Sequence, residues 1–267
     1  MSQSTEVQSL AKVTAAILAG GLGTRLRAVV ADRPKVLANV NGRPMLAHLL
    51  DQLARSGIKQ VVLCTGHMGD RVRAVLGDSY AGLRLSYSQE SCALGTAGAL
   101  RLALPLFESE SVLVMNGDSL CTVDLSDLWL RHQAMRVAGT IVLTESPDTS
   151  RYGSVRVDRE GLIVSFDEKQ GREAAGWINA GVYLLNRGLI GTIPVGGQCS
   201  LERHMFPAWI AQRLYGYKFT GQFLDIGTPE SFALADRLVG GWSAPHSEAT
   251  VNSEPPARAH RPTIQPQ

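Results

Sequence analysis

A short apolar run leads directly into a glycine-rich stretch near the start of this 267-residue chain. Residues 13–18 read as a buried β-strand, and the stretch that follows, Ala19-Gly20-Gly21-Leu22-Gly23-Thr24-Arg25-Leu26, predicts a sharp turn at the strand's end. Such a turn leaves backbone N–H groups unpaired, and glycine lets a ligand approach them closely. Arg25 and the nearby Pro34-Lys35 pair add two cations. We therefore expect this loop to bind a triphosphate.

Two familiar glycine loops do not fit these residues. The stretch lacks the G-K-[ST] ending of a P-loop, and its Gly-Gly-x-Gly does not follow the G-x-G-x-x-G spacing of dinucleotide-binding folds. A plain glycine-rich turn with a solvated arginine is the alternative interpretation. The Pro34-Lys35 pair, nine residues after Arg25, favours the phosphate site.

Apolar strands alternate with helical patterns along the first half of the chain. The predicted strands are 13–18, 60–65, 83–88 and 112–115, and the predicted helices are 44–56, 70–76 and 96–104. This alternation predicts an α/β fold: a Rossmann-like, doubly wound mixed sheet with helices on both faces. In the second half we predict short strands over 153–157, 162–167 and 177–185, then helices over 200–212 and from Thr228-Pro229.

A carboxylate follows the buried strand at 112–115. Asp118 closes the Asn116-Gly117-Asp118 turn, where a charged group needs a partner; an aspartate that bonds its own turn backbone is the alternative. Mg²⁺ usually takes one or two carboxylates plus phosphate oxygens, and Asp225 offers a second carboxylate. We therefore expect Mg²⁺ at Asp118 and Asp225. Because ligands of doubly wound sheets bind beyond the carboxyl ends of strands, the glycine loop and this turn should share one crevice.

Together these motifs resemble the signature of the sugar-1-phosphate nucleotidyltransferases, in which G-G-x-G-T-R-L is followed by P-K and then by a Pro-Met or Pro-Leu helix start. The chain carries that order in residues 20–26, Pro34-Lys35 and Pro44-Met45. Its Asn-Gly-Asp and Leu-Asp-Ile-Gly-Thr-Pro-Glu rows resemble the family's two metal motifs. The resemblance spans about residues 13–238. It implies the nucleotidyltransferase fold and transfer of a nucleoside monophosphate from a triphosphate to a sugar 1-phosphate, with release of pyrophosphate.

The resemblance also implies roles for individual residues. The catalytic residues would be Arg25, Lys35, Asp118 and Lys169, the last binding the sugar phosphate. The nucleotide-binding residues would be Ala19, Gly20, Gly21, Gly23, Thr24, Glu90, Gly95 and Thr96. The sugar-binding residues would be Asn116, Gly153, Glu168, Asn179 and Glu202. Taken singly, each could be an ordinary surface or strand-end residue, and a Glu-Lys pair after a strand is usually solvated.

Glu90 bears on the choice of base. One carboxylate can accept both donors of the guanine edge, whereas a thymine or uracil edge suits glutamine better, so GTP is favoured. Family members with a Glu-x-x-Pro-Leu-Gly-Thr loop have proline where this chain has Ala93. This departure from the family pattern weakens the base assignment more than the assignment of the reaction. Within the family the chain most resembles guanylyltransferases for D-glycero-D-manno-heptose 1-phosphate, which we prefer, or mannose 1-phosphate. The alternatives are a thymidylyl-, uridylyl- or adenylyltransferase for another hexose 1-phosphate, and a noncatalytic regulatory homologue.

Composition bounds the partners. A net charge of +2 without a basic cluster argues against nucleic acid, and the four scattered cysteines suit reduced thiols better than a zinc site or a disulfide framework. We find no membrane-length apolar stretch and no signal-peptide pattern, so we expect a cytoplasmic protein with no membrane partner. A homo-oligomer is compatible with this sequence.

The two ends of the chain differ from its body. We expect residues 1–11 and 241–267, which are polar or rich in proline, to be disordered, and residues 12–240 to form one nucleotidyltransferase domain. The sequence has no hexapeptide repeat, so we expect no C-terminal β-helix.

Overall fold

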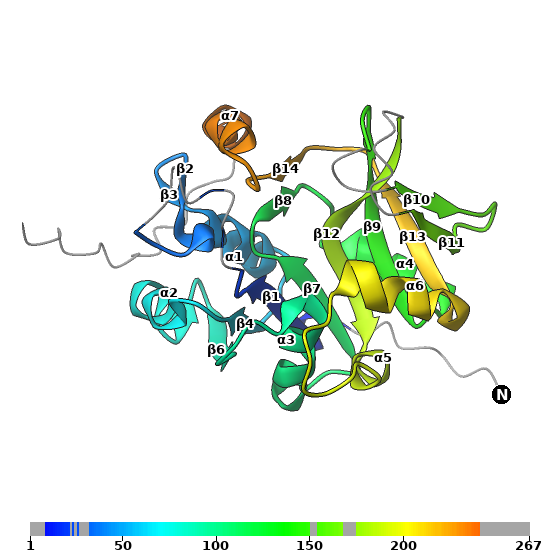
Figure 1. The fold of residues 1–267 in the computed structure, drawn as a ribbon, viewed down its shortest axis with the longest axis horizontal. Helices are drawn as coiled ribbons and strands as arrows, with labels where there is room; N and C mark the ends of the chain where they lie inside the picture. The colour runs from blue at the N-terminus through cyan, green and yellow to red at the C-terminus, as the bar shows by residue number, and fades with distance from the viewer. Residues whose placement is uncertain are drawn as a thin grey trace, which may run out of the picture.

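The computed structural model describes residues 9–21, 23, 26, 32–149, 154–167 and 175–240 of the chain. Within them, one eight-stranded sheet runs through the centre of the molecule in the order β13-β9-β12-β7-β1-β4-β6-β5 (Figure 1). Its strands are β1 (Thr14–Ala19), β4 (Gln60–Thr65), β5 (Ser79–Tyr80), β6 (Leu83–Gln89), β7 (Ser111–Asn116), β9 (Gly139–Ser146), β12 (Gly176–Asn186) and β13 (Leu214–Phe219).

Strand direction makes this a mixed sheet. β1 runs parallel to β4 and β7, β4 to β6, and β9 to β13, whereas β12 is antiparallel to both its neighbours and β5 to β6. The chain moves outward from β1 through β4 to β6 and then returns to the other side of β1 as β7. The strand order therefore reverses beside β1, which is where doubly wound sheets bind ligands.

Helices cover both faces of the sheet. One apolar core joins it to α1 (Met45–Arg55), α2 (Gly69–Leu76), α4 (Leu125–Met135) and α7 (Pro229–Gly240); the other joins it to α3 (Gly95–Ala103), α5 (Arg187–Gly191) and α6 (Phe206–Trp209). Strand β1 contributes side chains to both cores, because its successive side chains point to opposite faces of the sheet: Ala15 and Ile17 lie in the first core and Ala16 in the second. The predicted doubly wound α/β fold is confirmed.

Three small antiparallel ribbons complete the structure. They pair β2 (Asn39–Val40) with β3 (Arg43–Pro44), β8 (Ser119–Cys121) with β14 (Phe223–Asp225), and β10 (Ser154–Val157) with β11 (Ile163–Asp167). Short 3₁₀ helices span Leu10–Lys12, Lys35–Leu37, Leu104–Leu106 and Ile210–Gln212. Figure 1 shows α7 beside the β2–β3 ribbon, where the Asn41 N–H donates to Asp236 Oδ1 at 2.6 Å.

Local sequence placed the early elements well. The predicted helix over 44–56 is α1, whose apolar stripe of Met45, Leu46, Leu49, Leu50 and Leu53 is fully buried. Pro44 lies just before its first turn, where a missing N–H breaks no helical hydrogen bond.

The sequence analysis assigned no element to α4, β9 or β13. The apolar run of β9 is short, and β13 is interrupted by Gly216. That glycine is a packing requirement that sequence does not reveal: a Cβ there would lie 2.7 Å from side-chain atoms of Leu143 and Val157. The three strands predicted in the second half are present as β10, β11 and β12; β12 joins the main sheet, while β10 and β11 pair separately.

The predicted helix over 200–212 begins and ends as expected but is not one α-helix. Ser200 caps it by accepting the Arg203 N–H at 3.3 Å, and the chain then forms a π turn (Leu201–Met205), α6 and a 3₁₀ turn. Pro207 cannot donate a backbone hydrogen bond, which disfavours a continuous α ladder. At α7 the predicted cap is present: the Ser231 N–H donates to Thr228 Oγ1.

The part of the chain that the structure describes ends at α7 and contains no β-helix. None of the helices in these residues combines the length and the apolar character needed to cross a membrane.

Candidate functional site

A cavity of about 380 Å³ lies at the carboxyl ends of β1, β4 and β7. The residues that were predicted to bind substrate and that line it are Ala19, Gly20, Gly21, Gly23, Lys35, Glu90, Gly95, Thr96, Asn116 and Asp118. The sequence analysis did not propose the others: Leu18, Val36, Cys64, Ala93, Ala99 and Gln198. The glycine loop and the Asn-Gly-Asp turn therefore share one crevice, as expected.

Five predicted site residues lie outside the described residues: Thr24, Arg25, Gly153, Glu168 and Lys169. Their assignments stay predictions.

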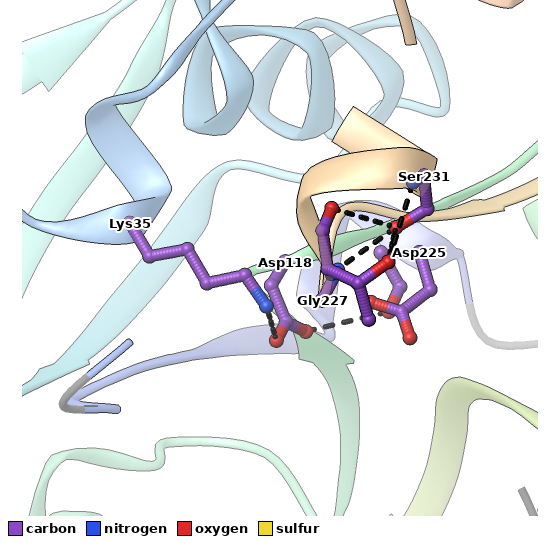
Figure 2. Close-up of polar contacts among 7 residues, drawn as sticks. Lys35, Asp118, Asp225, Gly227 and Ser231 are labelled. Carbon is purple, nitrogen blue, oxygen red and sulfur yellow. Dashed lines mark hydrogen bonds and ion pairs between the residues drawn. The ribbon is translucent and has the colours of Figure 1, made fainter. Parts of the chain in front are cut away.

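A tight ion pair links two of the predicted catalytic residues. Lys35 begins the short 3₁₀ helix after Pro34, and its Nζ lies 2.6 Å from Asp118 Oδ2 (Figure 2). The Lys35 side chain is only 11% exposed and that of Asp118 is 37% exposed, so the cation sits in the wall and the carboxylate faces the opening. Ser119 Oγ donates to the second Asp118 oxygen at 3.3 Å.

The β8–β14 ribbon brings Asp225 next to Asp118. Asp225 pairs opposite Ser119, and the Ile226 N–H donates to the Asp118 carbonyl oxygen at 3.0 Å. The Asp225 carboxylate accepts the Gly227 N–H at 2.6 Å, and a Cβ on Gly227 would lie 2.8 Å from the same oxygen. Figure 2 shows the Asp118 carboxylate beside the Lys35 ammonium and the Asp225 carboxylate on the far side of Asp118 from the lysine. Backbone pairing thus joins two motifs that are far apart in the sequence.

The donor set at this point fits Mg²⁺. Asp118 lines the cavity and already attracts a cation, the Lys35 ammonium. Asp225 is not a lining residue, but the β8–β14 ribbon holds it next to Asp118. Among the described residues no three His, Cys, Asp or Glu side chains gather into a metal cage. Asp118 and Asp225 would therefore share the ion with phosphate oxygens and water, as Mg²⁺ sites commonly do.

Glu90 faces the glycine loop from the next strand but one. Its Oε2 accepts the Leu94 N–H at 3.0 Å, and its Oε1 lies where a Cβ on Gly20 or Gly66 would be 2.9 or 2.7 Å away. Burial raises the pKa of the Glu90 carboxyl, and the Leu94 hydrogen bond partly offsets this effect. Glycine at positions 20 and 66 thus makes room for an acidic side chain inside the cavity.

The loop that follows Glu90 is fastened to the segment before Ser200. Gly95 has φ +74°, and a Cβ there would lie 2.4 Å from the Cys199 carbonyl oxygen. That oxygen accepts the Ala97 and Gly98 N–H groups at 3.0 and 3.3 Å, and the Cys199 N–H donates to the Leu94 oxygen at 2.8 Å. These contacts, which we call the clasp, place Gln198 on the cavity wall. Because the clasp is made by backbone atoms, no residue pattern in the sequence predicts it.

The three predicted sugar-binding residues that the structure describes, Asn116, Asn179 and Glu202, lie in one connected group. Asn116 lines the cavity, and Gly181, with φ +74°, lies so close that a Cβ there would be 2.8 Å from its Nδ2. Asn179 and Glu202 do not line the cavity themselves but reach Thr96, which does, through hydrogen bonds. The link between them is Tyr183, which sequence reasoning treated only as part of a buried strand.

Comparison with known proteins agrees with this geometry. A family model described as Nucleotidyl transferase matches residues 14–239. The chain is 34% identical to the D-glycero-alpha-D-manno-heptose 1-phosphate guanylyltransferase of Aneurinibacillus thermoaerophilus, over 84% of this chain and 96% of that protein. It is 37% identical to the mannose-1-phosphate guanylyltransferase of Mycobacterium tuberculosis, over 83% of this chain and 63% of that protein.

A crystal structure of HddC from Yersinia pseudotuberculosis complexed with GMP-PN superposes with a TM-score of 0.74 at 30% identity, covering 84% of this chain and 98% of that one. Shared sequence over nearly the whole described body and a shared fold lead to one conclusion: the chain belongs to the nucleotidyl transferase family.

Proposed function

We propose that the protein transfers GMP from GTP to a sugar 1-phosphate, giving a GDP-sugar and pyrophosphate. The preferred acceptor is D-glycero-D-manno-heptose 1-phosphate, with mannose 1-phosphate second. The observation that carries the proposal is the Lys35–Asp118 ion pair at the cavity formed by the glycine loop and the Glu90 loop, with Asp225 held next to Asp118 by the β8–β14 ribbon. A triphosphate and a phosphate monoester both need cations and backbone donors at one place, and this cavity supplies them.

The relatives support the substrate pair. The named relatives are guanylyltransferases for heptose 1-phosphate and mannose 1-phosphate, and the HddC structure holds GMP-PN. The chain matches the heptose enzyme over almost its full length but only 63% of the mannose enzyme. We therefore rank the heptose acceptor first.

The chemistry requires no general base. A phosphate monoester has its second pKa near about 6, so its oxygen is already ionised at neutral pH and can attack the α-phosphorus in line. The new bond forms between that oxygen and the α-phosphorus, and the bond to the bridging oxygen breaks as pyrophosphate leaves with the electron pair. The barrier to overcome is repulsion between the two anions.

Residues of this chain counter that repulsion. Gly20, Gly21 and Lys35 line the cavity. The backbone N–H groups of the two glycines would donate to the triphosphate, and the Lys35 ammonium would neutralise the charge that develops around the α-phosphorus. Asp118 and Asp225 would hold Mg²⁺, which supplies positive charge to the phosphates when bound. Arg25 on the triphosphate and Lys169 on the sugar phosphate belong to the same proposal.

The test is pyrophosphate release in the presence of Mg²⁺. ATP, GTP, CTP, UTP and dTTP are each tested against a panel of hexose and heptose 1-phosphates. Release with GTP and a manno-configured acceptor supports the proposal. Release with another triphosphate keeps the reaction and overturns the base, consistent with the alternative thymidylyl-, uridylyl- or adenylyltransferase. No release with any pair, together with retained GTP binding, favours a noncatalytic regulatory homologue.

A further inference from the structure

A fully buried tyrosine hydroxyl lies between the two predicted sugar-binding residues. Tyr183 on β12 is 0% exposed, and its ring packs against Phe206, with ring centroids 5.0 Å apart. Its hydroxyl contacts Asn179 and Glu202 and also has the Asn116 side chain as a hydrogen-bond partner, and the proposed reaction does not use it. Burying a hydroxyl costs folding free energy unless the hydroxyl is hydrogen-bonded. The hydrogen-bond partners of Tyr183 therefore indicate its role.

The hydrogen bonds around Tyr183 have one consistent direction. Asn179 Oδ1 accepts the Gly181 N–H at 2.8 Å, which leaves Asn179 Nδ2 to donate to the Tyr183 oxygen at 2.8 Å. The tyrosine proton then points to Glu202 Oε1, 3.5 Å away. Burial, and then the Glu202 charge, raise the pKa of Tyr183 well above its usual value, so the hydroxyl keeps this proton.

Glu202 continues the chain of contacts to the nucleotide side. Its Oε2 accepts the hydroxyls of Thr96 at 3.0 Å and Ser200 at 2.7 Å. Thr96 in turn accepts the Leu201 N–H at 2.8 Å and lines the cavity. One carboxylate oxygen is therefore occupied by short bonds, whereas the single bond to Oε1 among the described residues is the long one from Tyr183. Oε1 is the oxygen left with capacity to accept a substrate hydroxyl.

A β-bulge brings Asn179 and Tyr183 together. They pair with Leu143 and Ile141 of β9, so four steps along β12 match only two along β9. Gly181 sits inside the bulge with φ +74°, and a Cβ there would collide with the Asn116 amide. Bulges of this kind re-aim side chains next to active sites. The bulge thus explains why the Asn179 amide reaches a hydroxyl four residues further along the strand.

We propose that Tyr183 is a positioning residue for the sugar 1-phosphate. Its hydroxyl fixes the relative orientation of the Asn179 amide and the Glu202 carboxylate, which hydrogen-bond the sugar hydroxyls. Through Glu202 it also links this sugar site to Thr96 in the nucleotide loop. The inference rests on the proposed function and deepens it. Tyr183 itself does not touch the reacting atoms.

The test is Tyr183→Phe, which keeps the ring packing and removes only the hydroxyl. We expect the KM for the sugar 1-phosphate to rise about tenfold, because the reading groups lose their fixed orientation, with kcat and the KM for the triphosphate each changed by less than about threefold. Tyr217→Phe is the matched control. It also removes one tyrosine hydroxyl, which donates to Asp127 away from the cavity, and should leave all three constants unchanged.

A second variant separates positioning from simple structural support. If Tyr183 acts through its partners, Asn179→Ala should raise the same KM, and the double variant should be little worse than Asn179→Ala alone. Unchanged sugar kinetics in Tyr183→Phe would overturn the inference. So would equal losses for both substrates that follow a lowered Tm. If the wild-type protein transfers nucleotide to no sugar phosphate, it is the proposed function that has failed, and the inference falls with it.

Discussion

At the scale of single residues, the Asp118 carboxylate interacts with the Lys35 ammonium and, in the proposed reaction, with Mg²⁺. In the structure it neutralises the largely buried Lys35 ammonium at 2.6 Å. A carboxylate this close to a cation and to Asp225 concentrates opposite charges where phosphates would enter. Substitutions here should therefore affect turnover much more than folding.

We predict that Asp118→Asn lowers kcat at least about 100-fold, because it removes one metal ligand and leaves Lys35 without its counter-charge. The Ile226 hydrogen bond uses the Asp118 main chain and should persist, so circular dichroism should report an intact fold. Pyrophosphate release measures the loss. Asp78→Asn, which breaks an exposed pair with Arg73, is the control and should keep full activity. Full activity in Asp118→Asn would refute the role of this residue.

Glu90 carries the proposed preference for guanine. Glu90→Gln can still accept the Leu94 N–H but loses the charge that binds two donors of the base. We predict that the ratio of kcat/KM for GTP to that for UTP falls about tenfold. Because burial raises the pKa of Glu90 in the folded protein, its ionised form opposes folding, and Glu90→Gln should not lower Tm at neutral pH. An unchanged GTP-to-UTP ratio would show that Glu90 does not read the base.

At the scale of elements, the clasp between the Glu90 loop and Cys199 depends on a glycine. Gly95→Ala introduces strain at φ +74° and a Cβ 2.4 Å from the Cys199 oxygen. We predict a weaker triphosphate affinity, measured by calorimetric titration, because the Gly95 loop must move from the cavity wall. Gly77→Ala is the control for backbone strain: Gly77 has φ +69° and ψ −157° but open space around its Cβ, so this variant carries strain of about 1–3 kcal/mol and no clash. Equal affinities for the two variants would contradict the clasp.

Elements were predicted where their signal is local. The strands over 60–65 and 83–88 and helix α1 could be recognised from apolar periodicity and a proline start. The mixed π, α and 3₁₀ segment from Leu201 to Gln212 and the bulge in β12 could not, because both depend on what packs against them. For the candidate site, sequence motifs supplied the charged residues and glycines, whereas Tyr183, Cys199 and Gln198 carried no signal.

At the scale of the whole molecule, a buried histidine should make stability depend on pH. His132 is a residue of α4; its Nδ1 lies 2.9 Å from Oγ1 of Thr140 on β9, and the residue is 4% exposed. Burial lowers its pKa to about 4 from 6.5, with a hydrogen bond to Asn186 acting the other way. Between these two pKa values the unfolded chain binds a proton at His132 and the folded chain does not. The contribution of His132 to the free energy of unfolding is complete above about pH 6.5 and is lost as pH falls toward about 4.

We predict that acidification from pH 7 to pH 5 lowers the free energy of unfolding by about 2 kcal/mol through His132. Urea unfolding at both pH values measures it. His132→Gln should flatten this dependence even if it lowers stability at pH 7. The half-buried His48, whose pKa burial also lowers, should leave a smaller slope of the same sign. An identical slope in the variant would assign the effect to other groups.

The sequence by itself determined the α/β class, the glycine loop and the family. These features are written in short segments: apolar periodicity follows from backbone geometry, and a phosphate loop uses the N–H groups of consecutive residues. Only the tertiary structure decided that Asp118 and Asp225 meet, through the β8–β14 ribbon, and that Tyr183 joins Asn179 to Glu202. These contacts join segments that only the folded chain brings within hydrogen-bonding distance, and no local pattern encodes such a distance.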